Sequence, residues 1–543
     1  RLRALVPDEP ITDAELRRLE AATPAQARAL LETEGYFDAE VSVERIAGEP
    51  PQVRVVVEPG RQVKVDSVDW HFEGPLQQQA TAGDTRAVEV RDKLRHDWQL
   101  PPGAPFRSPA WSSAKSNAIA QLRAQGYASA DWRATEARVD AVDHTAALAL
   151  DAQSGPLYRS GEVRIEGLQR QDAQTVRNLA NFKPGTPATE KLLLDYQDRL
   201  ARAGLYSSAT VTMEPDPARA EDTPIDVRIQ ELPLHSATLG LGVSALTGPR
   251  MTAEHTNRRI LGLRATLRNK VELAKLRRAW EGELTSHTQP GLERNLVGGT
   301  VERLRTEDDI VTSARLRAGR AWERERLDRL AFVEIERASV DNSRGKTFST
   351  ALSANLHHTW RWVDSPLLPT DGVGLTLQTS AGHAVSDTGN GPYGRAYARL
   401  QYWKPLPAGW FGYARLDLGQ VFVRDSVRIP DTQRFRAGGD GSVRGYAYRS
   451  LGPKTDGVVG SGNMLMTGSV EVAHPLTPRI PGLWGALFVD AGDAANRWNQ
   501  LDPALGYGFG ARYRSPIGPL SVDIAYGERE QRFRLHLSVG VQF

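Results

Sequence analysis

The chain has 543 residues, and its 68 basic and 66 acidic side chains nearly cancel to a formal net charge of +2. This length predicts several domains rather than one core, and the balanced charge gives no overall field to recruit nucleic acid. The absence of cysteine excludes disulfides, thiolate metal sites and cysteine nucleophiles. No run of about 18 apolar residues occurs, which excludes a membrane-spanning helix but not a barrel, whose strands need only about 9 to 11 residues.

An internal repeat occupies the first 234 residues. An amphipathic helix, a glycine, and an alternating apolar and polar segment recur around Gly35, Gly126 and Gly204. Each glycine stands where the residue after a helix turns left-handed, and the alternation is typical of a half-buried strand. A further strand follows in each copy, as "QVRVVVEPG", "AALALDAQSG" and "IDVRIQELP". Each repeat is therefore predicted to be an α+β unit of strand, two helices, strand and strand.

The predicted boundaries of these units are 1–59, 60–155 and 156–234. The first unit lacks its opening strand, because Arg1 already lies close to a helix. The chain also begins without methionine or a signal-like apolar segment, so we expect that any targeting segment has already been removed.

Alternation replaces helical spacing from residue 235 to residue 543. Sixteen segments are predicted as strands, with starts near residues 236, 251, 263, 278, 299, 311, 327, 348, 371, 393, 410, 465, 483, 505, 519 and 532. One face of each is apolar and the other carries charge, which is typical of outer-membrane strands. An even number lets both ends meet antiparallel. We therefore predict a 16-stranded antiparallel membrane β-barrel; a soluble β-sandwich, whose strands are usually shorter, is the alternative.

The last segment, "RFRLHLSVGVQF", alternates up to an aromatic end. Leu537, Val539, Val541 and Phe543 share one face. Such a strand would be a poor free edge in a soluble sheet, and it is suited to closing a barrel.

Short motifs that suggest catalysis lack their structural context. "GLGVSA" is not followed by a helix, and "RGKT" has Val340 where a phosphate loop needs its first glycine. His357 and His358 are adjacent on a predicted strand and face opposite ways. No nucleophile, base and orienting group come together, so we expect a non-enzyme without cofactor or metal.

The segment "RFRAGGDGSVRGYAYRSLGP", from Arg434 to Pro453, has four arginines and five glycines but no strand or helix periodicity. The glycines permit positive φ and close backbone approach. The segment is therefore predicted to be a tightly folded loop that presents Arg444 from a fixed turn.

Together, the three repeats, the sixteen strands, this loop, the strand "ALFVDAGDA" and the aromatic terminus resemble the BamA/TamA superfamily of outer-membrane assembly proteins. The repeats then correspond to polypeptide-transport-associated (POTRA) units, and three of them are most similar to the TamA branch. The resemblance implies a barrel in the outer membrane with POTRA units in the periplasm. It also implies a role in inserting or secreting β-barrel clients such as autotransporters, with unfolded clients, membrane lipid and a periplasm-spanning TamB-like protein as partners.

In that superfamily the sixth extracellular loop, here about residues 426–463, folds back into the barrel. The resemblance makes Val443, Arg444, Gly445 and Tyr446 its anchoring motif. It implies Asp490 of the Phe-x-Asp-x-Gly string as the partner of Arg444. The alternation of that strand agrees, because Asp490 and Phe488 share the inward face.

Clients are expected to pair at a lateral seam between the first and last strands, because backbone groups in lipid need strand partners. Gly240, Gly242 and Gly540 would weaken side-chain packing there; alternatively, they only fit tight places. Two other functions remain open. A passive pore would leave the repeats without a role, and a two-partner secretion transporter would be expected to have two repeats.

Overall fold

The computed structural model describes residues 13–46, 52–244, 248–306, 308–324, 326–366, 368–480, 482–515 and 518–539. The chain divides into two compact units. The first extends to Leu168 and includes Phe182–Gln230, and the second combines Gln169–Asn181 with Glu231–Phe543. Among the described helices, none has both the length and the hydropathy that crossing a bilayer requires.

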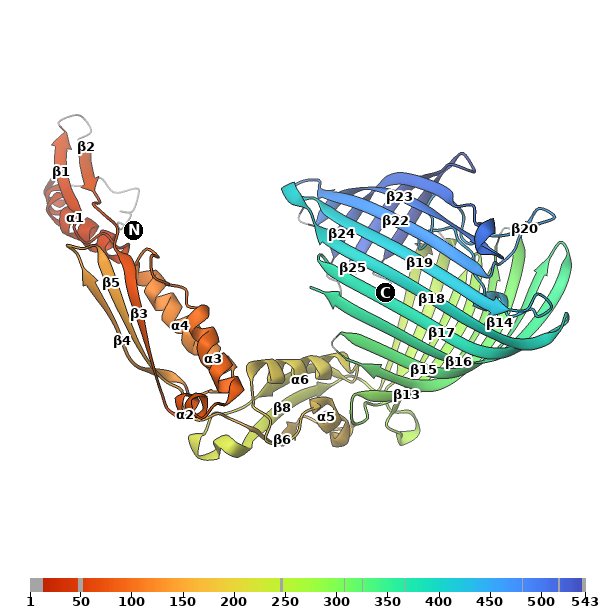
Figure 1. Cartoon of the computed structure of the whole chain (residues 1–543), viewed down its shortest axis with the longest axis horizontal. Coiled ribbons are helices and arrows are strands. Elements are labelled where there is room, and N and C mark those ends of the chain that lie inside the picture. Colours follow the sequence, from red (N-terminus) through yellow and green to blue (C-terminus); the bar gives the residue numbers. More distant parts are fainter. Residues whose placement is uncertain are drawn as a thin grey trace. The chain divides into compact units, whose positions relative to one another are not determined.

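The N-terminal repeats consist of helices and short strands (Figure 1). The first contains α1 (Asp13–Thr33), β1 (Glu40–Ile46) and β2 (Gln52–Glu58). The second contains β3 (Lys64–Glu73), α2 (Pro75–Thr81), α3 (Thr85–His96), α4 (Ser108–Ala124), β4 (Asp131–Asp140) and β5 (Thr145–Gln153). The third contains β6 (Ser160–Glu166), α5 (Ala173–Ala180), α6 (Glu190–Arg202), β7 (Tyr206–Thr212), η1 (Pro217–Asp222) and β8 (Thr223–Glu231). The short helix α2 adds to the two helices predicted per repeat.

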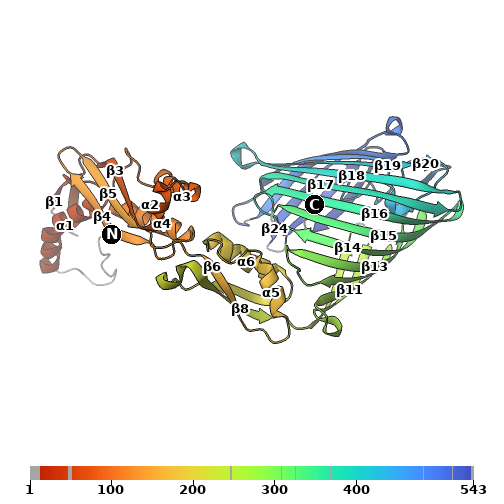
Figure 2. The same ribbon diagram turned by 60° about the horizontal axis from the view of Figure 1, so that its bottom comes forward.

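The second and third repeats have the same sheet topology. Their strand orders are β3-β5-β4 and β6-β8-β7, and the first and last strands of each repeat run parallel. Figure 2 shows β3, β5 and β4 of the second repeat. In the first repeat, β1 and β2 form an antiparallel pair. In the second repeat, Leu94 of α3 and Leu122 of α4 pack with Phe72 and Ala152 of the sheet.

The glycines that mark the repeats have the predicted backbone conformation. Gly35, Gly126 and Gly204 follow α1, α4 and α6 with φ of 92°, 98° and 69°. A side chain at Gly126 would also come within 3.1 Å of Leu157. The repeats can be recognised in the sequence because each one ends a helix with a glycine of positive φ.

The second unit contains one sheet of sixteen strands curled into a barrel. The strands are β9 (His235–Ser244), β10 (Gly248–Asn257), β11 (Ala265–Ala274), β12 (Arg277–Ser286), β13 (Glu293–Arg305), β14 (Asp309–Glu323), β15 (Leu327–Asn342), β16 (Gly345–Val363), β17 (Gly372–Ser386), β18 (Asn390–Pro405), β19 (Phe411–Val423), β22 (Met464–Pro475), β23 (Leu483–Ala495), β24 (Ala504–Ser515), β25 (Gly518–Gly527) and β26 (Arg532–Val539). The short pair β20 (Lys454–Thr455) and β21 (Val458–Val459) lies outside this sheet.

The predicted fold class is confirmed, and the alternative of a soluble sandwich is wrong. The predicted and the observed first residues of the barrel strands differ most at β13, which begins at Glu293. The reason is that Gly298 and Gly299 resemble a turn in the sequence. In the structure these glycines pair with Arg317 and Leu316 inside the ladder. The predicted unit boundaries remain predictions.

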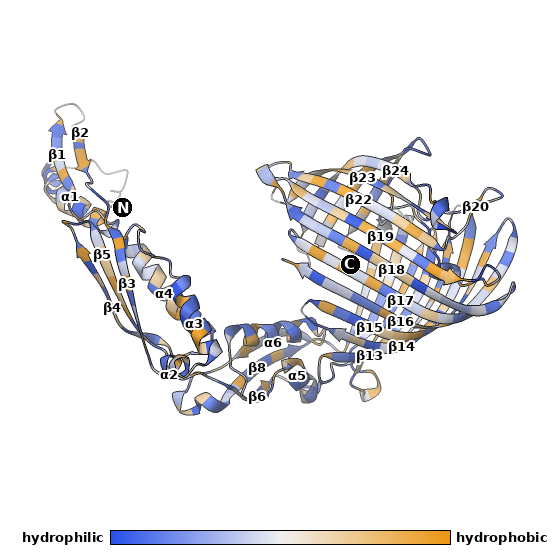
Figure 3. Ribbon diagram, viewed as in Figure 1, coloured by the Kyte–Doolittle hydropathy of each residue, from blue (hydrophilic) through white to orange (hydrophobic). Residues whose placement is uncertain are grey.

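Successive side chains of a β-strand face opposite ways, and Figure 3 shows hydrophobic and hydrophilic residues interleaved along the barrel strands. On β23, Leu487 and Val489 are 58% and 54% exposed, whereas Phe488 and Asp490 are 3% and 1% exposed. The apolar outer positions suit lipid, and the inner positions can hold polar groups.

Candidate functional site at the inward-folded loop

Residues 424–463, which we call loop 6, connect β19 to β22 and pack into the barrel interior. The loop includes the short turn η4 (Asp431–Gln433). Its buried side chains form one cluster with residues of the wall. The loop members are Val427, Ile429, Phe435, Ala437, Val443, Tyr446 and Leu451, and the wall members include Ala351, Ala384, Tyr393, Val421, Leu465, Ala494 and Ala504.

Arg444 binds Asp490 in a two-pronged geometry. Its Nε and Nη2 donate to the two carboxylate oxygens at 2.8 and 2.9 Å, and its backbone N–H donates to the same carboxylate at 2.9 Å. The guanidinium carbon lies 3.4 Å from the centre of the Phe488 ring. Because Arg444 is only 8% exposed, water competes little for these charge-assisted bonds.

Further wall residues complete the surroundings of Arg444. Its Nη1 donates to Glu471 at 3.1 Å and to Asp523 at 3.0 Å, and its Nη2 donates to Ser469 at 3.2 Å. Arg512 bridges the same two acids, with bonds of 2.5 and 2.7 Å to Glu471 and of 2.5 and 3.2 Å to Asp523. Two arginines thus offset three carboxylates, which lets the charges be buried together.

The resemblance implied Asp490 as the partner of Arg444, and the structure brings the two together. Neither the resemblance nor the strand pattern indicated Ser469, Glu471, Arg512 and Asp523. These residues come from β22, β24 and β25 and share no motif. Their only signal is a polar side chain at an inward position of a strand. Register then aligns Asp490 with Ser469 across β22 and β23.

Glycines let the loop backbone touch the wall. Gly445 has φ of 95°, and a Cβ there would approach the Gly527 nitrogen to 2.7 Å. A Cβ on Gly527 would lie 2.6 Å from the Gly445 oxygen, and one on Gly506 would overlap the Arg444 oxygen. This matching of loop and wall glycines was not predicted.

The other residues of the predicted motif are fully buried. Val443 and Tyr446 are each 0% exposed. The Tyr446 hydroxyl donates to the Leu505 carbonyl at 2.8 Å and accepts from the Arg529 N–H at 3.0 Å. The motif is thus held on β24 and on the turn between β25 and β26.

A second ionic cluster holds loop 6 to a different part of the barrel wall, at β14. Arg436 pairs with Asp309 of β14 at 2.5 Å, and the two side chains are 2% and 1% exposed. Asp431 accepts from Arg449 at 2.7 Å. In addition, the Val459 N–H donates to Asp308 at 3.0 Å. Loop 6 is therefore fixed at points far apart in the barrel sequence.

Two of the predicted seam residues, Gly240 and Gly242, lie on the end strand β9. A Cβ on Gly240 would lie 2.6 Å from Thr252 Oγ1, and one on Gly242 would lie 3.6 Å from Arg250 Nε, so Gly240 occupies the tighter place. On β26, Leu537 is half-buried and Val539 is the final strand residue. Gly540, Val541 and Phe543 lie outside the described residues.

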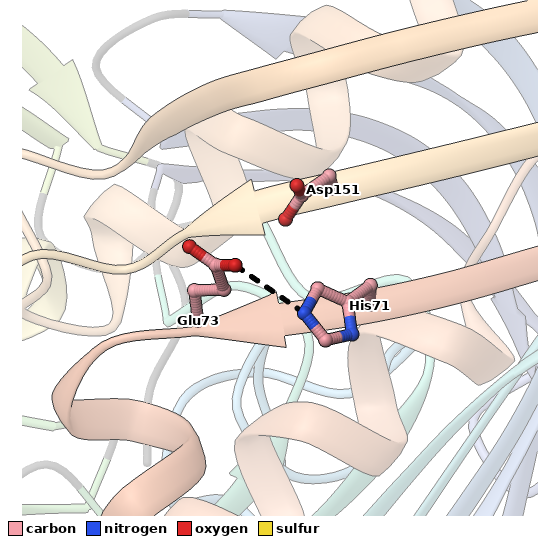
Figure 4. Close-up of side chains that lie close together, drawn as sticks. All are labelled: His71, Glu73 and Asp151. Atoms are coloured by element: carbon pink, nitrogen blue, oxygen red, sulfur yellow. Dashed lines mark ion pairs between the residues drawn. The ribbon is translucent and has the colours of Figure 1, made fainter.

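In the second repeat, His71, Glu73 and Asp151 offer possible metal-ligand atoms within 4.8 Å of one another (Figure 4). Arg133 already pairs with Glu73 and has its Nε 3.8 Å from Asp151. The hydrogen bond from Arg133 lowers the pKa of Glu73, although partial desolvation opposes it. We therefore interpret these residues as an ion-pair cluster on β3, β4 and β5.

The fold and the anchored loop define the class of protein: a membrane β-barrel preceded by α/β repeats. Residues 236–543 match the Omp85 superfamily domain. This match covers more than half of the chain, and the chain belongs to that family. The barrel is located in the outer membrane, and the N-terminal POTRA units lie in the periplasm.

A solved structure has a similar fold, and two curated proteins are similar over short stretches. BamA from Haemophilus ducreyi lacking POTRA domains 1–3 superposes with a TM-score of 0.63 and 18% identity, covering 88% of this chain and 100% of that one. Outer envelope protein 80 of Arabidopsis thaliana chloroplasts is 32% identical over 121 residues, which is 20% of this chain and 15% of that protein. Outer envelope protein 39 from the same plant is 36% identical over 111 residues, 18% of this chain and 28% of that protein. The match to the Omp85 superfamily domain confirms the predicted superfamily.

Proposed function

We propose that this protein is a TamA-like assembly factor that inserts or secretes β-barrel clients, such as autotransporters, across its lateral seam. Its proposed partners are unfolded outer-membrane clients, the surrounding lipid and a periplasm-spanning TamB-like protein. Membership of the Omp85 family supports a role in transport or assembly rather than catalysis.

One observation carries the proposal: β9 and β26 occupy the two ends of the sheet order. Every other barrel strand has a neighbour on both sides, whereas the described residues give β9 and β26 one ladder each. Unpaired N–H and C=O groups are costly in lipid. A client strand that supplies the missing bonds would therefore be stabilised at this seam.

The packing of loop 6 favours assembly over a passive pore. Barrels of 16 to 18 strands can enclose an aqueous channel, but here buried loop residues pack against the interior wall. The end strands of the periplasmic sheets, such as β4 and β7, offer edges to which partner strands can add.

A reversible disulfide across the seam tests the proposal. One cysteine replaces Gly240, and the second is scanned through Ser538 and Gly540 until oxidation yields a crosslink. We expect oxidation to suppress the display of an autotransporter client and reduction to restore it, because a locked seam cannot accept a client strand. The chain has no cysteine of its own to interfere.

The matched control places cysteines at Thr350 and Val385, which pair directly across β16 and β17. This crosslink joins strands away from the seam and should leave display unchanged. Equal display by the oxidised and reduced seam variants would contradict the proposed lateral mechanism.

A further inference from the structure

His536 connects the last barrel strand to loop 6. It lies on the inward face of β26 and is 5% exposed. Its Nε2 accepts a hydrogen bond from the Gly445 backbone N–H at 2.9 Å. Its Nδ1 contacts the carboxylate of Asp440. The ring therefore bridges two points of the loop that flank Arg444 on its N-terminal and C-terminal sides.

The contacts determine which ring nitrogen carries the proton. A backbone N–H can only donate, so Nε2 is the acceptor, and the proton of the neutral ring is on Nδ1. Nδ1–H then donates to Asp440, whose side chain is 9% exposed. Both nitrogens are used, so a side chain that only fills the same space would replace neither bond.

The turn that presents Asp440 is itself constrained. The Ser442 N–H donates to the Gly439 carbonyl at 3.0 Å, and the Gly439 N–H donates to the Val443 carbonyl at 3.1 Å. Arg415 of β19 donates to the Ser442 carbonyl at 2.6 Å. A displacement of Asp440 is thus transmitted to residues 439–445 rather than absorbed by a loose segment.

Several strands of the barrel wall each contact this turn. Arg444 binds side chains of β22, β23 and β25, and Tyr446 binds the β24 backbone. Through His536, β26 contributes its own two contacts. It is also an end strand with a described ladder on β25 alone.

We propose that His536 is a positioning residue that couples the pairing of β26 to the tether of loop 6. When β26 moves away to receive a client, the acceptor for Gly445 and the donor to Asp440 move with it. The turn beside Arg444 then loosens. This inference rests on the proposed function, since it assumes that the seam opens.

Hydrogen exchange of the full chain in lipid nanodiscs measures this coupling directly. The backbone amides of residues 439–446 are followed with the seam disulfide oxidised and reduced. With His536 present, we expect oxidation to slow their exchange by about tenfold, the size expected when one or two hydrogen bonds are secured. In His536→Leu, exchange should be fast and the same in both forms.

Other variants separate coupling from a general loss of structure. Ser469→Ala weakens the Arg444 tether without touching β26 and should speed exchange equally in both forms. His536→Gln, which can still accept and donate, should restore part of the difference. His383→Leu replaces an exposed histidine on β17 and should behave as the unaltered protein.

An equal response to oxidation in His536→Leu and in the unaltered protein would overturn the coupling. Heat-modifiable migration in gels verifies that each variant is folded. Autotransporter display is scored in the same strains. Unchanged display after oxidation would contradict the proposed function, whereas the exchange ratio tests the coupling independently.

Discussion

At the scale of single residues, Arg444 is the group whose removal should matter most. Arg444→Ala would leave Asp490 buried without its charged partner, whereas Glu471 and Asp523 would keep their bonds to Arg512. Breaking one side of a buried pair costs about 3 to 5 kcal/mol, enough to release a glycine-rich loop. We expect greater protease cleavage of loop 6 and impaired client display.

Lysine at this position should rescue only partly, because it lacks the planar fork that binds both Asp490 oxygens. The control is Arg428→Ala in the same loop. Arg428 and Asp387 form a pair at 3.3 Å with both side chains more than a third exposed, worth about 0 to 1 kcal/mol. Arg444→Ala with the cleavage pattern of this control would show that the arginine is not a tether.

At the scale of elements, Glu231 joins the end of β8 to the segment before α5. Its carboxylate accepts the backbone N–H groups of Gln169, Arg170 and Gln171 at 2.7 to 3.0 Å. This segment and α5 also bond to turns of the barrel: Arg264 pairs with Asp172 at 3.1 Å, and Asn178 donates to the Thr288 carbonyl at 2.8 Å. Residues 169–181 therefore form a structural joint with the barrel.

Glu231→Gln should loosen this joint, because hydrogen bonds to a charged acceptor contribute about 1.5 to 3 kcal/mol. Burial raises the pKa of Glu231, but the three backbone donors outweigh it, so this pKa lies below its ordinary value of 4.5. The contribution is thus complete above pH 4.5 and is lost as the pH falls through the lower folded-state pKa.

Hydrogen exchange of residues 169–181, compared between the two proteins at each pH, measures this contribution. We expect a constant difference at neutral pH that shrinks under acid conditions. A difference that grew as the pH fell would show that the carboxylate is not the stabilising species.

At the scale of the whole molecule, loop 6 should block ion flow through the barrel. We expect low, flickering conductance in planar bilayers, because the loop packs into the interior. A variant with residues 426–463 replaced by a short turn should conduct steadily. A large, steady current through the unaltered protein would instead indicate an open pore.

The sequence predicted the barrel well because each strand signals itself locally. The alternation around Leu487 and Asp490, for example, needs no knowledge of the neighbouring strands. Glu471, Asp523 and His536 could not be assigned in this way, because their roles depend on register between strands and on where loop 6 descends. The need for glycine at positions 506 and 527 was missed for the same reason, because it is imposed only by the loop backbone that lies opposite Gly506 and Gly527.

The places where loop 6 is fastened have a consequence for how the barrel itself forms. Its hydrogen bonds and ion pairs reach β14 and β15 on one side and β22 to β26 on the other. Those strands can therefore gather around the loop as an early nucleus. Joining β9 to β26 spans nearly the whole barrel sequence, and contacts between such distant segments form late. Opening the seam for a client would then reverse the last step of the protein's own folding.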